Sequence, residues 1–330
     1  MLQRQDISCW GEQPTRKSEP IGESQPHGEV GAMLRPPLLP LTHVCLYILL
    51  GIPQDTCQVQ LSMMPDAFDD QYIGCEVEMD GRAPGLLMEE MSMSTLLSTV
   101  WKNSEQKWQS VKTKLSLPSG FKDEHGRAIV AYTDNAFHGE LNQAVRENGK
   151  SPADYMDKFH FKAFHYYLTR ALRLLRGSCG VMYKETVYRG TDVSHTGSGI
   201  IRFGFFASSS FDRAKAEKFG KATVFTIHTC LGVDIRNFSH FQEEEEVLIP
   251  VHEQFSASPG QGSHSFVLWS TNQTCSNFNC AFLNRTKNSV CADNSATGGG
   301  IAFPSQMSPS LFGGSIILLH VAALKLFASF

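Results

Sequence analysis

The sequence lacks an excess of positive charge. Its 330 residues include 29 Lys and Arg against 33 Asp and Glu, which gives a formal net charge of -4 at pH 7. No predicted helix carries a stripe of Lys and Arg along one face, so the electrostatic footprint of a nucleic-acid-binding protein is missing. We therefore expect no nucleic acid among the natural ligands. The hydrophobic fraction of 42% is ordinary for a globular protein.

The motifs of several common enzyme classes are missing as well. Gly197, Gly199 and Gly204 do not have the G-x-G-x-x-G spacing of a dinucleotide-binding turn, and they precede a strand pattern instead of a helix. No G-x-S-x-G segment occurs, which leaves a serine hydrolase without support. No C-x-x-C pair occurs, and His160 and His165 are five residues apart, so they do not share a helix face as zinc ligands would. We expect no bound metal and interpret both histidines as core or interface residues.

The N-terminal region is typical of a processed leader. Residues 1–32 are polar and without periodicity, and either Met1 or Met33 is the start of translation. From Met33, one Arg precedes an apolar run of about a dozen residues and then a more polar segment, which is the layout of a secretory signal. We predict a signal peptide over 33–57. The alternative is a buried helix over 41–51, but "PPLLP" directly before it is a poor helix start.

The C-terminal region is typical of a lipid-attachment signal. Residues 291–310 are mostly small and polar, and residues 311–330 form an apolar run. This order fits a GPI-attachment signal, whose tail is removed when the anchor is added. We predict a folded domain over 58–294 and a removed propeptide over 295–330. The domain would then be anchored at the extracellular face of the plasma membrane; a secreted form, or a core strand in the apolar run, is the alternative.

The cysteines and the glycosylation acceptors are consistent with a protein that enters the secretory pathway. Nine cysteines in a chain that enters the secretory pathway predict a disulfide framework before a metal site. Three N-x-S/T acceptors, Asn237, Asn272 and Asn284, are consistent with an extracellular surface.

The first half of this domain has a helical pattern, up to Gly177. Within 93–112, apolar residues recur at helical spacing and predict one buried face. They are Leu97, Val100, Trp101, Trp108 and Val111. Further helices are predicted over 135–148 and 151–177, and the second of these has Ser151 as its N-cap and a proline in its first turn.

The second half has a strand pattern. Five short β-branched or aromatic runs are separated by Gly, Pro, Asn or Ser. The predicted strands are 185–191, 199–210, 221–230, 245–255 and 264–271, with one short helical piece over 211–220. A helical half packed against a β core is an α+β arrangement in a single domain.

The segment "FQEEEEVLIP" places four glutamates directly before an apolar strand. If the strand extends back into the glutamates, side chains alternate, with Glu244 and Glu246 on one face and Glu243 and Glu245 on the other. Two carboxylates about 7 Å apart on one strand edge could hold two parts of one substrate, or two substrates. A solvated loop is the alternative interpretation of this charge run.

Two further motifs give the glutamates a context. An arginine stands in "VYRGT", and a serine cluster ends "FGFFASSS". With Arg, Ser and Glu-x-Glu on separate strands in this order, the chain resembles the mammalian GPI-linked arginine-specific ecto-ADP-ribosyltransferases, and more closely their lymphocyte-type branch. The resemblance covers roughly Ala67 to Cys280. Other matching stretches are "AFDDQYIGC", "AIVAYT", "FHFKAFHYYLTRAL", "FTIHTCLG" and "SNFNC".

The resemblance implies a fold and a reaction. The fold is the ADP-ribosyltransferase fold, with a helical half packed on a core of two small sheets. The reaction is transfer of ADP-ribose from NAD, or NADP, to arginine side chains of surface or secreted proteins, with release of nicotinamide. NAD is then a co-substrate, and no cofactor is bound permanently. The alternatives are an NAD glycohydrolase, which uses water as the acceptor, and a catalytically silent surface antigen on the same scaffold.

The resemblance also implies site residues. Arg189 looks like the family's arginine that contacts NAD phosphate, with the Gly190 backbone near the carboxamide. Ser208 matches the serine that supports the nicotinamide ribose and the catalytic glutamate. Glu246 takes the catalytic position, and Glu244 takes the position that selects arginine as the acceptor.

Two aromatic residues and two disulfides complete this expectation. Phe219 would stack on nicotinamide, and Phe241 would lie on the substrate-recognition turn. The family's pairing implies two disulfides, Cys75–Cys280 and Cys179–Cys230. Glu243 and Glu245 should be largely replaceable.

Overall fold

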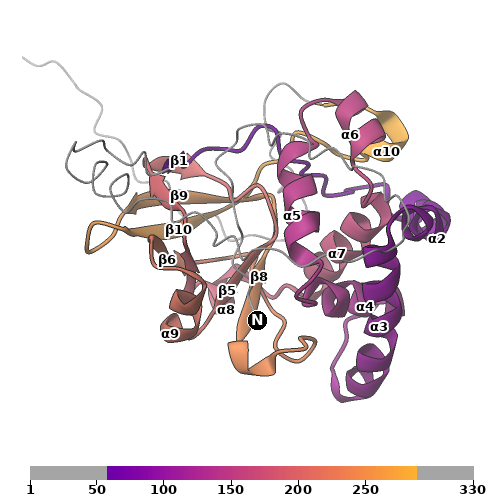
Figure 1. Cartoon of the computed structure of the whole chain (residues 1–330), viewed down its shortest axis with the longest axis horizontal. Helices are drawn as coiled ribbons and strands as arrows, with labels where there is room; N and C mark the ends of the chain where they lie inside the picture. Colours follow the sequence, from indigo (N-terminus) through magenta and orange to yellow (C-terminus); the bar gives the residue numbers. More distant parts are fainter. Residues whose placement is uncertain (1–57, 288–330) are drawn as a thin grey trace, which may run out of the picture. The chain divides into compact units, whose positions relative to one another are not determined.

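The structure is a computed structural model, and it describes residues 58–287. The predicted leader over 33–57 and the predicted propeptide over 295–330 lie outside the described residues. Within the described range, long helices come first and most strands follow, which confirms the α+β class. Figure 1 shows helices α2 to α7 gathered on one side and strands β6, β9 and β10 on the other.

Serine side chains cap two helices of the helical half, and one of them, Ser151, is the predicted N-cap. Ser94 caps α3 (Thr95–Val111), because its Oγ accepts a hydrogen bond from the Leu97 amide at 3.1 Å. Ser151 caps α6 in the same way, through the Asp154 amide at 3.1 Å. The five apolar residues predicted for one face of α3 are all buried. The other helices are α2 (Glu76–Met93), α4 (Asp123–Tyr132), α5 (His138–Glu147), α6 (Pro152–Lys158), α7 (Lys162–Leu175), α8 (Cys179–Met182), α9 (Arg213–Ala216) and α10 (Ala281–Asn284), with 3-10 helices η1 (Lys112–Lys114), η2 (Glu217–Phe219) and η3 (Gln242–Glu244).

The predicted helix over 151–177 is in fact two helices, α6 and α7. The chain leaves the helical conformation at Phe159. At the start of α7, the Ala163 amide donates a hydrogen bond at 2.9 Å to the buried carboxylate of Glu90, which belongs to α2. A cap that another helix supplies has no local sequence signal, which is why the prediction missed the break. Helix α5 also begins later than predicted, at His138.

The strands form one large mixed sheet and one small parallel sheet. The large sheet has the order β4-β9-β10-β6-β2-β5-β8-β7, and β1 pairs with β3 in the small one. A single register pair, Tyr188 opposite Ser210, joins β2 to β5. The two small sheets expected from the resemblance therefore correspond to a five-stranded and a three-stranded part of one continuous sheet. The strands are β1 (Gln58–Gln60), β2 (Val187–Thr191), β3 (Ser194–Thr196), β4 (Gly199–Ile201), β5 (Ala207–Ser210), β6 (Thr223–His228), β7 (Val233–Asp234), β8 (Glu246–Ile249), β9 (Glu253–Pro259) and β10 (Ser265–Thr274).

Two predicted strands are each divided. Residues 199–210 form β4 and β5, which lie in different parts of the sheet. Between them, the buried Arg202 guanidinium binds the Asp69 carboxylate at 2.7 Å and three backbone carbonyls. Gly204 then adopts a φ of 70°, in the left-handed region that favours glycine. Residues 245–255 likewise contain the whole of β8 and the start of β9.

Polar contacts and a disulfide fasten the segment before α2 to the segment after β10. Asp69 and Asp70 each accept hydrogen bonds from two backbone amides within 277–281. Both predicted disulfides are present, Cys75–Cys280 and Cys179–Cys230. The first of them closes this same junction, so the helical half and the end of the β core are covalently joined.

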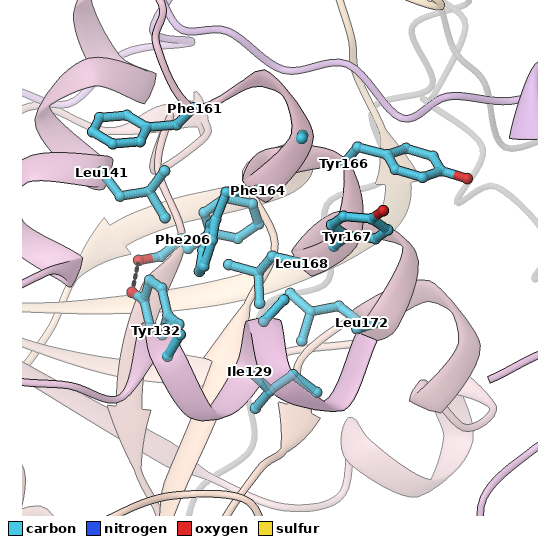
Figure 2. Close-up of a cluster of buried hydrophobic side chains, with 14 of the residues drawn as sticks. Ile129, Tyr132, Leu141, Phe161, Phe164, Tyr166, Tyr167, Leu168, Leu172 and Phe206 are labelled. Atoms are coloured by element: carbon cyan, nitrogen blue, oxygen red, sulfur yellow. Dashed lines mark hydrogen bonds between the residues drawn. The ribbon is translucent and has the colours of Figure 1, made fainter. Parts of the chain in front are cut away.

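The helical core reaches the sheet through Phe206. Figure 2 shows its ring among side chains of the helical half, and the ring centroid lies 6.0 Å from that of Tyr132 and 5.3 Å from that of His165. The Tyr132 hydroxyl donates a hydrogen bond to the Phe206 carbonyl at 2.8 Å, drawn as a dashed line. Because Phe206 directly precedes β5, the core fixes the start of the strand that carries Ser208.

Candidate active site

Three of the predicted site residues lie where the two parts of the sheet meet. Arg189 follows Tyr188 on β2, and Ser208 lies on β5. Tyr188 pairs with Ser210, which pairs in turn with Glu246, the first residue of β8. Neighbouring strands therefore bring together an arginine, a serine and a glutamate that are far apart in the sequence.

A backbone group and an aromatic ring hold the Arg189 guanidinium. Its Nη1 donates a hydrogen bond to the Ser208 carbonyl at 2.6 Å, and its Cζ lies 5.2 Å from the centroid of the Phe205 ring. Burial lowers the pKa of Arg189, and the nearby Tyr132 and Glu246 oppose this shift. Arginine stays protonated at neutral pH, so the site contains a fixed positive charge.

A hydrogen-bond network positions Ser208. Its Oγ lies 3.2 Å from the Tyr132 hydroxyl. The Asn142 Nδ2 donates to that hydroxyl and to the Phe206 carbonyl, both at 3.1 Å. Tyr132 and Asn142 are site residues that the sequence did not predict. A polar side chain on the buried face of a predicted helix, between Leu141 and Val145, is the signal that could have identified Asn142.

Glu246 is the buried member of the glutamate run, and its side chain is only 3% exposed. Burial raises the pKa of Glu246 to about 7, and the charge of Glu244 also raises it. A hydrogen bond from Ser208 and the positive charge of Arg189 act in the opposite direction. A carboxyl group with this pKa is partly ionised at neutral pH.

The predicted alternation of the glutamates along a strand is wrong. Residues 242–244 form η3, and Glu245 has a φ of 50°, so β8 starts only at Glu246. A turn, rather than the pleat of a strand, brings Glu244 near Glu246. The Ser210 Oγ donates a hydrogen bond to the Glu244 carbonyl at 2.7 Å and so fixes this turn against β5. The turn also keeps the other three glutamates out of the buried region that contains Glu246. Several carboxylates there would repel one another, because little water screens their charges.

The other residues of the turn differ in their exposure to solvent and in their contacts. Glu243 is exposed. The Glu245 carboxylate accepts a hydrogen bond from the Lys215 Nζ at 3.0 Å, which links the turn to α9. Phe241 directly precedes η3 and is partly buried. That Glu243 and Glu245 are replaceable stays a prediction, and Glu245 has the contact that makes it the less tolerant of the two.

Two glycines allow the segment around Phe219 to lie against β2. A Cβ on Gly190 would come 2.4 Å from the Gly220 carbonyl oxygen. Gly220 has a φ of 145°, and a Cβ there would come 2.2 Å from the Thr191 backbone. Any side chain at either position would therefore push η2 away from the strand that carries Arg189.

A cleft lies along this site. The predicted site residues in its lining are Arg189, Gly190, Ser208 and Phe219. The rest of the lining comes from the helical half, the strands and α9, namely Tyr132, His138, Asn142, Tyr188, Thr191, Asp192, Ser209 and Ala216. Glu246 and Glu244 are not in this lining, and Glu246 adjoins it through its hydrogen bond with Ser208.

Other candidate sites receive no support from the described residues. Within residues 58–287, no group of three His, Cys, Asp or Glu side chains could hold a metal ion. In the same part of the chain, no helix is both long and apolar enough to cross a membrane. His165 is a core residue, with its Nδ1 2.8 Å from the Tyr72 hydroxyl, whereas His160 is exposed.

Comparison with known proteins identifies the family of the chain. The family model described as NAD:arginine ADP-ribosyltransferase matches residues 61–276. The chain belongs to this family. Ecto-ADP-ribosyltransferase 5 from Mus musculus is 46% identical over 277 residues, covering 81% of this ADP-ribosyltransferase and 89% of the relative. T-cell ecto-ADP-ribosyltransferase 1 from Mus musculus is 45% identical over 237 residues, covering 69% and 79%.

Solved structures agree with this assignment. A crystal structure of the eukaryotic mono-ADP-ribosyltransferase ART2.2 is 42% identical to this ADP-ribosyltransferase, with a TM-score of 0.61. The match covers 68% of this chain and 99% of that one. Two mutants of ART2.2 have been solved in complex with NADH and with NAD. The predicted fold is therefore confirmed.

Proposed function

We propose that this ADP-ribosyltransferase moves ADP-ribose from NAD to arginine side chains and releases nicotinamide. The observation that carries the proposal is the position of Glu246. It is a buried carboxylate beside Ser208, on a strand that is joined through Ser210 to the strand of Arg189. Family membership supports the reaction, and this geometry supports the assignment of roles.

Glu246 is assigned to the cleavage step. The bond between the ribose C1' and the nicotinamide nitrogen breaks, and nicotinamide leaves with the bonding electrons. Positive charge develops on the ribose, and an ionised carboxylate held nearby stabilises it. Burial strengthens this interaction because little water screens it. Ser208 holds the Glu246 carboxylate by a hydrogen bond.

Glu244 is assigned to the acceptor step. A protonated guanidinium has no free lone pair, so the acceptor must lose a proton as its nitrogen bonds to C1'. A carboxylate can orient the guanidinium and accept that proton. Glu244 lies on η3 and is more exposed than Glu246, as a group that meets an incoming protein side chain must be. Water in place of arginine would give NAD hydrolysis.

The cleft residues are assigned to NAD. Arg189 provides a fixed charge and planar donors for a phosphate. Gly190 exposes its backbone to the carboxamide, and Phe219 offers a ring face to nicotinamide. NAD, or NADP, would thus bind as a co-substrate between the two parts of the sheet.

The proposal extends to the extracellular surface. The relatives are named ecto-enzymes, and the three acceptor asparagines, Asn237, Asn272 and Asn284, are all exposed. The predicted leader and tail would bring the domain to the outer leaflet through a GPI anchor, where surface or secreted proteins would supply arginines. Phosphatidylinositol-specific phospholipase C should release the protein from cells. Retention on the cells after treatment would contradict the anchor.

The activity is tested with purified protein and NAD labelled in its adenylate part. The acceptor is agmatine, which carries a guanidinium, and a second reaction has no acceptor. Label on agmatine supports the proposal. Free ADP-ribose alone supports the glycohydrolase, and no product supports the silent antigen.

Two substitutions test the assigned roles. Glu246→Gln should lower both transfer and hydrolysis by about 100- to 1000-fold, because the developing charge loses its carboxylate. Glu244→Gln should remove transfer to agmatine and leave hydrolysis, with Glu243→Gln as the unaffected control. Transfer that persists in Glu244→Gln would refute the division of roles, and activity in Glu246→Gln would refute the catalytic assignment.

A further inference from the structure

The face of the five-stranded part that is turned away from its core carries an exposed tryptophan. Phe266 and Leu268 of β10 are buried in that core, and Trp269 lies on the opposite face, 43% exposed. Figure 1 shows β10 between β9 and β6, and the register places Ser256 of β9 and His228 of β6 directly beside Trp269. A large exposed aromatic ring on a sheet face is a candidate for contact with another group.

The two faces of the Trp269 indole have different surroundings. One face stacks on the His228 ring, with the centroids 3.9 Å apart and the planes at 4°, and Tyr183 lies 5.9 Å from the indole. Because His228 lies on β6, the other face is turned toward β9, where Ser256 is exposed and too short to cover it. Across β9, Ile200 of β4 lies opposite Ser256 and is 49% exposed. Two strand spacings separate β4 from β10 by about 10 Å, which leaves room for a flat ring against the indole.

An N-glycosylation acceptor follows Trp269 on the same strand. Asn272 and Thr274 form the acceptor, and Asn272 is three residues after Trp269, at most about 10 Å along the strand. A bulge interrupts β10 between Ser270 and Thr274, and Asn272 within it has a φ of 56°. Leu268 and Ser270 are buried, and regular alternation would bury Asn272 with them. Asn272 is nevertheless exposed, so the bulge turns the acceptor out of the core.

The aromatic residues nearest in sequence to the other two acceptors belong to the core. Phe238 follows Asn237 and is buried in the helical core. Phe282 stands two residues before Asn284 and packs against the same core. Asn272 is therefore the acceptor whose neighbouring ring has a face open to a sugar.

We propose that Asn272 carries an N-linked glycan whose first sugars pack on the open face of Trp269. This inference rests on the part of the proposed function that takes the chain through the secretory pathway. There, the Asn272 Nδ2 loses a proton and bonds to the anomeric carbon of the first N-acetylglucosamine, and the lipid diphosphate that carried the oligosaccharide leaves with the bonding electrons. The product is a glycosylated asparagine on the exposed face of β10.

The chemistry of the two rings explains the contact. One face of an N-acetylglucosamine ring consists of C–H groups, and the negative face of an aromatic ring attracts their partly positive hydrogens. The contact also removes apolar surface of Trp269 and Ile200 from water, which is favourable. The glycan would stabilise the five-stranded part and keep other proteins from packing on this face.

Peptide mass spectrometry of the full chain, purified from mammalian cells, measures the occupancy of each acceptor. We expect a glycan on Asn272. If Asn237 or Asn284 carries a glycan and Asn272 does not, the inference is wrong and the extracellular location stands. If all three are empty, both fail. Transfer of label to agmatine is measured on the same protein, so a glycan on Asn272 without transfer would leave this inference intact and refute the proposed reaction.

Fluorescence reports the contact, because Trp269 is exposed and Trp101 and Trp108 are buried. Asn272→Asp removes the acceptor and keeps a residue that tolerates positive φ. Acrylamide should quench this variant more strongly than the glycosylated wild type. Wild type with high-mannose glycans, trimmed by endoglycosidase H to one N-acetylglucosamine, should stay as protected as the untrimmed protein. Equal quenching of all three samples would show that the indole face is open to another partner and would overturn the inference.

Thermal unfolding tests whether the contact stabilises the protein. Asn272→Asp should melt about 2–4 °C below the glycosylated wild type, because a contact of this kind is lost. The same change in a Trp269→Ala background should have no effect, and in a Trp269→Phe background, which keeps an aromatic face, most of the shift should remain. Asn237→Asp is the matched control and should act equally in all backgrounds. An equal shift from Asn272→Asp with and without the ring would contradict the contact.

Discussion

At the scale of single residues, the four consecutive glutamates have four different environments. Glu243 is exposed, Glu244 lies on a tight turn, Glu245 pairs with Lys215, and Glu246 is buried. Identical side chains therefore have different chemistry. Only the buried one combines a raised pKa with a serine that holds its carboxylate.

The pH dependence of activity should follow the pKa of Glu246. Stabilisation of the ribosyl cation requires the ionised carboxylate, and burial raises the pKa of Glu246 to about 7. We expect kcat/KM for NAD to increase as the pH rises through about 7 and to level off above it. Initial rates measured between pH 5 and 9 check this expectation. A flat profile from pH 5 to 7 would mean that Glu246 ionises at its ordinary value.

At the scale of elements, the turn before β8 depends on a serine. Ser210 binds the Glu244 carbonyl, whereas the neighbouring Ser209 Oγ is buried without a partner in the described residues. Ser210→Ala should reduce transfer to agmatine several-fold more than hydrolysis, because the turn that presents Glu244 loosens. Ser256→Ala, at an exposed serine on β9, is the control and should change neither rate. Equal loss of both activities in Ser210→Ala would point to a general loss of structure.

The cap that Glu90 provides for α7 should make stability depend on pH. Burial raises the pKa of Glu90 to about 8, against an ordinary value of 4.5. Between these two pH values the unfolded chain loses a proton that the folded protein keeps, so stability falls as the pH rises. The loss is at most about 1.4 kcal/mol per pH unit.

Glu90→Gln tests this cap because it resembles the protonated form. The variant should retain the hydrogen bond to the Ala163 amide and lose the pH dependence that Glu90 causes. Urea unfolding at pH 5 and pH 8 measures both proteins. A wild type that loses no stability relative to Glu90→Gln over this range would show that Glu90 is ionised in the fold.

At the scale of the whole described domain, the two predicted disulfides close loops of different length. Cys75–Cys280 spans 205 residues, and Cys179–Cys230 spans 51. In the chain-entropy model, the longer loop contributes about 5 kcal/mol and the shorter about 4. Replacing both cysteines of the longer loop with serine should therefore destabilise the protein more, as measured by denaturant unfolding. The reverse order would show that local contacts outweigh loop entropy here.

The features that sequence analysis predicted depend on nearby residues or on a matched motif. The cap at Ser151 and the buried face of α3 follow from local spacing. The resemblance supplied Arg189, Ser208 and Glu246. The features it missed depend on distant parts of the chain: the Glu90 cap, the turn at the glutamates and the network around Tyr132. Tertiary contacts of this kind leave no periodic signal in the sequence.

One register pair, Tyr188 with Ser210, and one hydrogen bond, from Arg189 to the Ser208 carbonyl, join the two parts of the sheet at the site. Arg189 belongs to the five-stranded part of the sheet, and Ser208 and Glu246 belong to the three-stranded part. A rotation of about 6° between these parts would displace a group ~10 Å from the joint by about 1 Å, which costs on the order of a hundredfold in rate. The resistance of this joint to rotation therefore determines how well the distance between Arg189 and Glu246 is maintained. A dinucleotide bound to both parts of the sheet would restrict that rotation.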